Sequence, residues 1–303
     1  MDELRFDDRV VVITGAGRGI GRSHALLFAE RGAQVVVADY GVAIDGRGAS
    51  SGPADAVVSE SRAAGGQALA CFADVSEESA ATTIVEVALD TFGRLDAVVN
   101  NAGINDPAPF EDLTSEQFRR MMDVHFFGTL FVTQAAWKHF RATGYGRIVN
   151  TASEAMLGGI PQLSSYGAAK GAVFGLTRNL ATEATGTGIR INAIAPRAHT
   201  RMSASENDRL AELFHMDEAT MTAVNASMPP DRCSPTALYL AHDTCDLNGE
   251  VIQVGMGGAA RLAVVHAHGL TKDPLTPEDI AENIGAILDV NDARVTDAAS
   301  MAM

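Results

Sequence analysis

Tyr166 and Lys170 are the residues whose types and spacing most clearly indicate chemistry. They stand four positions apart in a segment with a helical pattern, so both side chains should project from one helix face. With only four tyrosines and three lysines in 303 residues, this spacing is expected by chance about 0.04 times. A phenol with a pKa of about 10 is a poor base near neutral pH, but a neighbouring ammonium favours the phenolate. The pair therefore predicts a base for an alcohol proton, with three lysine N–H donors left to hold sugar hydroxyls.

Ser153 is the third candidate catalytic residue. It follows an expected strand at residues 146–151 and precedes Tyr166 by thirteen positions. The carboxyl end of a strand and the next helix meet at one edge of a parallel sheet, so both hydroxyls could hold one substrate oxygen. The alternative is a serine that only caps a helix.

A glycine turn follows the first expected strand and opens the first helix. Gly15, Gly19 and Gly21 form the pattern G-x-x-x-G-x-G and not a strict G-x-G-x-x-G. Glycines let backbone amides approach a pyrophosphate closely, and the helix N-terminus adds further donors. The alternative is a glycine-rich surface loop.

Asp39 ends the second expected strand and sets the expected cofactor. A carboxylate there accepts from the ribose 2′-hydroxyl of NAD and disfavours the 2′-phosphate of NADP. Arg18 in the glycine turn argues the other way. The free-energy cost of burying the Asp39 carboxylate beside a 2′-phosphate is larger than the stabilisation that one flexible arginine provides. NAD is therefore favoured over NADP. Asp74 and Val75, after the third strand, are expected beside the adenine, although Asp74 could instead cap a helix.

The rest of the chain supplies the elements that must position these residues. Continuous Val/Ile runs alternate with helical segments, which predicts strands covered on both faces. The expected class is α/β: a single-domain, doubly wound Rossmann fold with a seven-stranded parallel sheet and helices on both faces. The strands are expected at 10–14, 34–39, 67–72, 97–100, 146–151, 190–195 and 250–254, and the helices at 19–31, 53–64, 76–92, 115–142 and 164–185.

Three segments fall outside this alternation. Residues 40–52 are rich in Gly and Ser and are expected to form a long loop, and residues 196–230 are expected to form an irregular lid. We expect the dinucleotide-binding and catalytic domain to span residues 1–258. Residues 259–303 should form an extension with one helix at 277–288.

Composition narrows the class of protein further. A net charge of −15 argues against nucleic-acid binding, which depends on phosphate neutralisation. No apolar run is long enough to span a bilayer, and the N-terminus has no signal-peptide pattern, so we expect a cytoplasmic protein without membrane partners. The three cysteines are expected to be buried free thiols. No metal site is expected, since His266 and His268 have no further ligand nearby.

These motifs together resemble the short-chain dehydrogenase/reductase family. The resemblance covers residues 5–258 and includes Thr14–Gly21, Asn100–Gly103, Ser153 and the Tyr166–Lys170 pair. It implies an NAD-dependent oxidoreductase for secondary alcohols, forming a homodimer or, alternatively, a tetramer through helices 115–142 and 164–185. It also implies cofactor contacts by Ile20, Asn101, Ala102, Gly103, Ala198, His199, Thr200 and Arg201.

His125 departs from the usual pattern of that family. Most members have asparagine at this position, where it is thought to hold a water molecule in a proton relay. Here His125 is expected to be either a substitute member of the relay or a structural residue.

A closer resemblance is to the (3R)-hydroxyacyl-CoA dehydrogenase branch of the same family. It rests on Arg5–Asp7, Tyr40–Gly52, Asp123–His125, Ala135–Trp137, Ala195–Met202 and, more weakly, Leu275–Glu278. It implies a (3R)-3-hydroxyacyl-CoA substrate, whose phosphates would need cations such as Arg197, Arg201 or Arg261. The alternatives are a 17β-hydroxysteroid or other free secondary alcohol, and a regulatory protein that binds NAD without catalysis.

Overall fold

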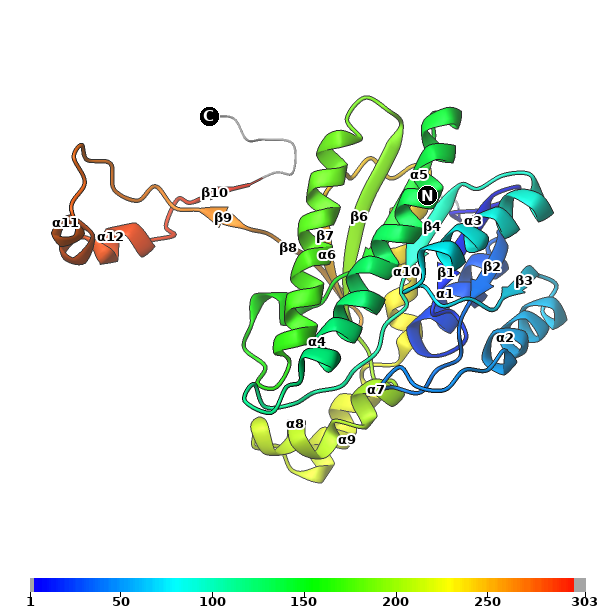
Figure 1. Cartoon of the computed structure of the whole chain (residues 1–303), viewed down its shortest axis with the longest axis horizontal. Helices are drawn as coiled ribbons and strands as arrows, with labels where there is room; N and C mark the ends of the chain where they lie inside the picture. The colour runs from blue at the N-terminus through cyan, green and yellow to red at the C-terminus, as the bar shows by residue number, and fades with distance from the viewer. Residues whose placement is uncertain (1–2, 297–303) are drawn as a thin grey trace.

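The computed structural model describes residues 3–296 and has an eight-stranded sheet in the order β3-β2-β1-β4-β5-β6-β7-β8 (Figure 1). The first seven strands are parallel, as expected for a doubly wound fold. Their bounds are β1 Val10–Thr14, β2 Gln34–Ala38, β3 Gln67–Cys71, β4 Ala97–Asn100, β5 Gly146–Thr151, β6 Ile189–Arg197 and β7 Val251–Gly255.

The prediction of seven strands was wrong by one. Strand β8 (Gly258–Leu262) pairs antiparallel with β7 through a two-residue turn. Met256 and Gly257 both have positive φ in that turn, which matches the twist of a tight hairpin. Met is an unusual residue at such a position, so the turn has little signature in the sequence.

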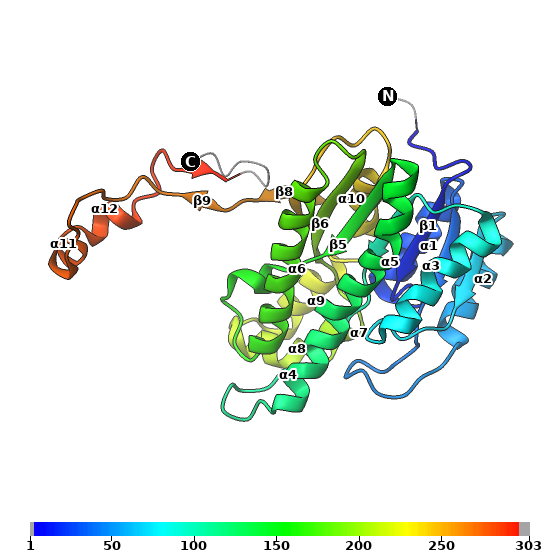
Figure 2. The same ribbon diagram turned by 45° about the horizontal axis from the view of Figure 1, so that its top comes forward.

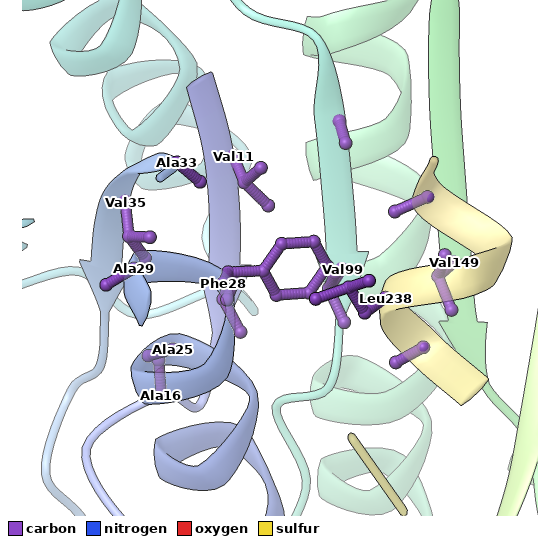
Figure 3. Packing of buried hydrophobic residues seen from close by; sticks show 14 of the residues in the cluster. Val11, Ala16, Ala25, Phe28, Ala29, Ala33, Val35, Val99, Val149 and Leu238 are labelled. Atoms are coloured by element: carbon purple, nitrogen blue, oxygen red, sulfur yellow. The ribbon is translucent and has the colours of Figure 1, made fainter. Parts of the chain in front are cut away.

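Helices cover both faces of the sheet, and the central strands β1, β4 and β5 are buried along their whole length. One layer contains α1 (Gly19–Glu30), α2 (Gly52–Ala63) and α10 (Ser234–Ala241), and Phe28 of α1 packs there against Val11, Val99 and Leu238 (Figure 3). The opposite layer contains α3 (Glu78–Phe92), α5 (Gly128–Thr143) and α6 (Ser164–Glu183).

The single helix predicted at 115–142 is interrupted. It consists of α4 (Ser115–Met122), a π-helical turn at Asp123–Phe127 and α5. The amide of Gly128 donates to the carbonyl of Asp123, five residues earlier, and the Thr129 hydroxyl donates to the His125 carbonyl. This wider turn contains His125, and π turns of this kind frequently occur at functional sites.

The predicted lid contains more regular structure than expected. Three short helices, α7 (Arg201–Ala204), α8 (Asn207–Leu213) and α9 (Glu218–Ala226), lie between β6 and α10. Thr200 caps α7 and Asp217 caps α9 through side-chain oxygens that accept backbone N–H bonds. Each of these helices is too short to show a clear 3.6-residue apolar repeat, so the sequence pattern did not predict them. A 3₁₀ turn at Pro230–Cys233 follows α9, and another at Glu154–Leu157 lies between β5 and α6.

The C-terminal part beyond β8 projects from the body as an arm (Figure 2). It contains β9 (Val265–His266), α11 (Pro277–Glu282), α12 (Ile284–Leu288) and β10 (Arg294–Val295). The one helix predicted at 277–288 is thus divided at Asn283. In the described residues no group of three metal-ligating side chains occurs, and no helix is long and apolar enough to cross a membrane. The three cysteines are free and buried, as predicted.

Candidate active site

A cavity of about 350 Å³ opens along the carboxyl edge of the sheet, where β1, β2, β4, β5 and β6 end. Sixteen of the residues predicted to bind cofactor or substrate line it: Gly15, Arg18, Gly19, Ile20, Asp39, Asp74, Val75, Asn101, Ala102, Gly103, His125, Tyr166, Lys170, Ala198, Thr200 and Arg201. Of the predicted catalytic and cofactor-binding residues, Gly21, Ser153 and His199 are not part of this lining.

The glycine turn is shaped by close backbone approach. Gly15 and Gly19 have positive φ angles of 63° and 54°. A side chain at Gly21 would overlap the Gly15 carbonyl and the Asn101 amide, so Gly21 is required for packing and not for contact with the cavity. Asn101 holds the turn from the other side, because its Nδ2 donates to the carbonyls of Thr14 and Gly15 at 3.0 and 3.1 Å.

The first turn of α1 leaves backbone donors for a ligand. The helix has no side-chain cap bond at Arg18 and no acidic residue in its first turn. The first amides of a helix need an acceptor, and a phosphate group is one that fits. The glycine turn and this uncapped end therefore fit the pyrophosphate of a dinucleotide.

Asp39 lies beside the glycine turn and organises it. Its Oδ2 accepts from the Gly17 amide at 2.7 Å and its Oδ1 from the Gly41 amide at 2.6 Å. Arg18 does not pair with this carboxylate. Its guanidinium donates to the Val42 carbonyl at 3.2 Å, and Arg201 from the lid donates to the same oxygen at 2.9 Å. These two hydrogen bonds hold the loop at residues 40–52 over the cavity.

Asp74 forms an Asx turn and also lines the cavity. Its Oδ1 accepts from the amide and the hydroxyl of Ser76, at 3.0 and 2.7 Å. Asp74 therefore makes the local capping contact that was considered as its alternative role. Its contact with the adenine stays a prediction.

Tyr166 and Lys170 lie together on α6 at the inner end of the cavity. Lys170 is buried, its Nζ donates to the Thr151 carbonyl at 2.6 Å, and it lies 5.6 Å from the centre of the Tyr166 ring. Ser153 is joined to Tyr166 by a hydrogen bond, and its Oγ accepts from the Ala155 amide at 3.2 Å. The three side chains expected to act together are thus neighbours in space.

The direction of the tyrosine pKa differs from the expectation drawn from the lysine spacing. Burial raises the pKa of Tyr166, and the hydrogen bond from Ser153 opposes that rise only in part. Burial also lowers the pKa of Lys170 to about 7, because an ammonium loses its hydration there. A lysine whose own charge is disfavoured by burial, and that lies over the ring, does not offset the desolvation of the phenolate.

His125 lies behind this pair. Its Nε2 is 2.9 Å from the Ile104 carbonyl oxygen and 3.2 Å from the Ile104 amide, and its ring meets that of Tyr166 edge-on at 5.1 Å. Burial, with a smaller effect from Lys170, holds the pKa of His125 well below its usual value, so the ring is neutral.

Several lining residues were missed in the sequence. Thr151 ends β5 beside Lys170 and could have been found from the strand-end rule. The others are mainly apolar and come from the loops and the lid, including Val42, Ile104, Ile160, Leu163, Met202 and Leu210. Their positions depend on long-range contacts such as the bond from Arg209 of α8 to the Pro161 carbonyl at 3.0 Å.

Two of the three arginines considered for a CoA phosphate are already paired. Arg197 makes a two-bond ion pair with Glu154, at 2.5 and 2.7 Å, and Arg261 makes one with Glu250, at 2.6 and 2.7 Å. Of the three, only Arg201 lines the cavity.

Comparisons with known proteins give the family of this architecture. The family model described as short chain dehydrogenase matches residues 9–211. Peroxisomal multifunctional enzyme type 2 of Mus musculus is 39% identical over 96% of this chain, but the chain spans only 38% of that enzyme.

Two solved structures are similar throughout the fold. A short chain dehydrogenase from Mycobacterium avium has a TM-score of 0.77 and 35% identity, covering 93% of this chain and 95% of that one. A 7α-hydroxysteroid dehydrogenase in complex with NADH and 7-oxo glycochenodeoxycholic acid has a TM-score of 0.72 and 29% identity, covering 85% of this chain and 98% of that one. The glycine turn, the Ser153–Tyr166–Lys170 cluster and these similarities together place the chain in the short-chain dehydrogenase family.

Proposed function

We propose that this chain oxidises a secondary alcohol to a ketone with NAD, and that its substrate is a (3R)-3-hydroxyacyl thioester of coenzyme A. The observation that carries the reaction type is the contact of Ser153, Tyr166 and Lys170 at the inner end of a cavity that begins at a glycine turn. Oxidation removes a proton and a hydride from the alcohol, and the bound nicotinamide supplies the hydride acceptor.

The protein side chains perform the proton step. The hydroxyls of Ser153 and Tyr166 hold the alcohol oxygen, and the Tyr166 phenolate accepts its proton as general base. Lys170 is fixed to the Thr151 carbonyl, which leaves its other N–H donors for ribose hydroxyls.

NAD is proposed over NADP because of the charge at Asp39. Its two oxygens already accept from Gly17 and Gly41, so the carboxylate is held in place beside the cavity. A 2′-phosphate there would meet this fixed anion, while a ribose hydroxyl would donate to it. The guanidinium groups of Arg18 and Arg201, which could otherwise bind a 2′-phosphate, both donate hydrogen bonds to the Val42 carbonyl.

The acyl-CoA proposal rests on the similarity to the multifunctional enzyme and on the apolar outer wall of the cavity. Ile160, Leu163, Met202 and Leu210 offer a surface for an acyl chain. A free hydroxysteroid is the second candidate, and the similarity to a 7α-hydroxysteroid dehydrogenase favours it. A cytoplasmic location is retained only as an expectation from the sequence.

A substrate comparison tests the proposal. We expect kcat/KM, followed by NADH absorbance, to be at least about tenfold higher for a (3R)-3-hydroxyacyl-CoA than for the free hydroxy acid or a hydroxysteroid. NADP in place of NAD should lower kcat/KM by a similar factor. Equal values for thioester and free alcohol would reject the acyl-CoA proposal. Tight NADH binding without turnover of any alcohol would instead support a regulatory protein.

We further propose that the chain forms a homodimer. The arm carries a set of exposed large apolar side chains: Val264, Val265, Leu275, Ile280, Ile284, Leu288, Val290 and Val295. On α6, a Cβ added at Gly171 or Gly175 would meet no atom within 4 Å, so a second helix could approach closely. Apolar surface of this extent is usually covered by a partner.

Light scattering measures this directly. At micromolar concentration the mass should be twice that of one chain, or four times if dimers pair. Removal of residues 263–303 should lower the dimer's stability to dilution. A full-length protein that is monomeric at this concentration would contradict the proposal.

A further inference from the structure

The strongest observation that the proposed function leaves unused is the environment of His125. Its ring occupies the space that a side chain at position 103 would need: a Cβ on Gly103 would lie 2.5 Å from Cε1 and 3.2 Å from Nδ1 of His125. Gly103 does not belong to the glycines with positive φ. Glycine is therefore required at 103 to make room for the ring and not to permit an unusual backbone angle.

The backbone of Ile104 provides both a donor and an acceptor for the Nε2 atom of His125. It lies within hydrogen-bond distance of both the carbonyl oxygen and the amide of that residue. A protonated Nε2 donates to the carbonyl and an unprotonated Nε2 accepts from the amide, so one bond forms in either neutral tautomer. The π turn is thereby tied to the loop that follows β4.

The other nitrogen, Nδ1, is buried and has no hydrogen-bond partner among residues 3–296. In the described part of the chain, neither nitrogen bonds to Tyr166 or Lys170, and the ring meets Tyr166 only by its edge. The depressed pKa adds to this, because a neutral imidazole is a weak proton donor.

We infer that His125 is a positioning residue that works with Gly103: it fixes the Gly103–Ile104 loop against the cofactor cavity and holds the Tyr166 ring by edge contact. The inference rests on the proposed function for its kinetic consequences. Of the two roles considered for His125, relay member and structural residue, the inference selects the structural one and names Gly103 as its partner.

Two substitutions separate the roles of the two nitrogens. The amide nitrogen of glutamine stands as many bonds from Cβ as Nε2 of histidine, whereas that of asparagine corresponds to Nδ1. His125→Gln should therefore keep the bond to Ile104 and lose only the ring contact. We expect its Kd for NADH, measured by NADH fluorescence, to stay within about twofold of wild type, with kcat lowered about threefold to tenfold. His125→Asn should raise that Kd about fivefold to tenfold and lower kcat as well, as expected for one lost hydrogen bond.

Gly103→Ala completes a double-mutant cycle. In the presence of His125 it should raise the Kd for NADH about tenfold and lower the thermal unfolding midpoint, because the methyl group displaces the ring. In the His125→Asn background the same change should cost little, so the two effects are strongly non-additive.

Three results would overturn the inference. They are additive effects of the two substitutions, better retention of NADH affinity by asparagine than by glutamine, and a His125→Asn enzyme with wild-type Kd and kcat. The cycle measured on unfolding midpoints does not depend on turnover. A wild-type chain that neither binds NADH nor oxidises alcohols would therefore refute the proposed function while the Gly103–His125 coupling could still be tested.

Discussion

Tyr166→Phe is expected to lower kcat by about 10²–10⁴-fold while NADH affinity stays within about twofold of wild type. The hydroxyl is the proposed base, and the ring keeps its edge contact with His125 in the variant. Because burial raises the pKa of Tyr166, the phenolate fraction increases with pH, so wild-type kcat/KM for oxidation should rise toward alkaline pH.

The measurement is a pH profile of kcat/KM for both proteins, together with NADH titrations. Tyr145→Phe is the control, since Tyr145 lies between the guanidinium groups of Arg9 and Arg147 and outside the cavity lining. A Tyr166→Phe enzyme with more than about a tenth of wild-type kcat would remove tyrosine from the role of base.

Lys170→Met is expected to abolish most activity and yet to stabilise the fold at low pH when no cofactor is added. The lysine has a pKa of about 7 when folded and about 10.5 when unfolded, so the unfolded chain binds its proton more tightly. Below pH 7 the folded protein carries the full cost of a buried ammonium, on the order of 5 kcal/mol. The lost bond to Thr151 offsets about 1–3 kcal/mol of the gain, which leaves roughly 2–4 kcal/mol.

The sign of the pH dependence makes this a specific test. Wild-type stability should rise with pH between 7 and 10.5 relative to the variant, because the folded lysine is already neutral there while the unfolded one is still charged. Urea unfolding at pH 6 and pH 9 should show a clear advantage of Lys170→Met at pH 6 and little or none at pH 9. Lys138→Met, at an exposed position on α5, should show no such trend. A variant that is less stable than wild type at pH 6 would reject this account.

The sheet and the inner site could be predicted well because both depend on short-range patterns. Strands such as β1 and β5 are continuous buried runs, and the glycine turn and the Tyr166–Lys170 spacing are local. The eighth strand was missed because its turn uses Met256 at positive φ.

The outer site was predicted less well because it is assembled from distant segments. The Val42 carbonyl receives Arg18 from the glycine turn and Arg201 from the lid, and no local pattern indicates such a contact. Similarly, the Arg197–Glu154 pair joins residues 43 positions apart, so an arginine that looked available for a phosphate is already neutralised. Lysine pKa values also depend on burial, which the spacing of Tyr166 and Lys170 does not indicate.

The π turn between α4 and α5 affects which changes of chain length this enzyme can accept. Met121, His125 and Thr129 are all buried although they are spaced by four, more than the 3.6 residues of an α-helical turn. The π turn accommodates this difference because it contains more residues per turn than an α-helix. Removal of one residue from 123–127 would restore regular winding and leave the later side chains close to their present angle relative to α4, because a π turn holds about one residue more than an α-helical turn. The sheet-facing residues of α5 would keep their orientation, while the wide turn that contains His125 would be lost. A single deletion here should therefore cost more in the active site than in the packing of α5.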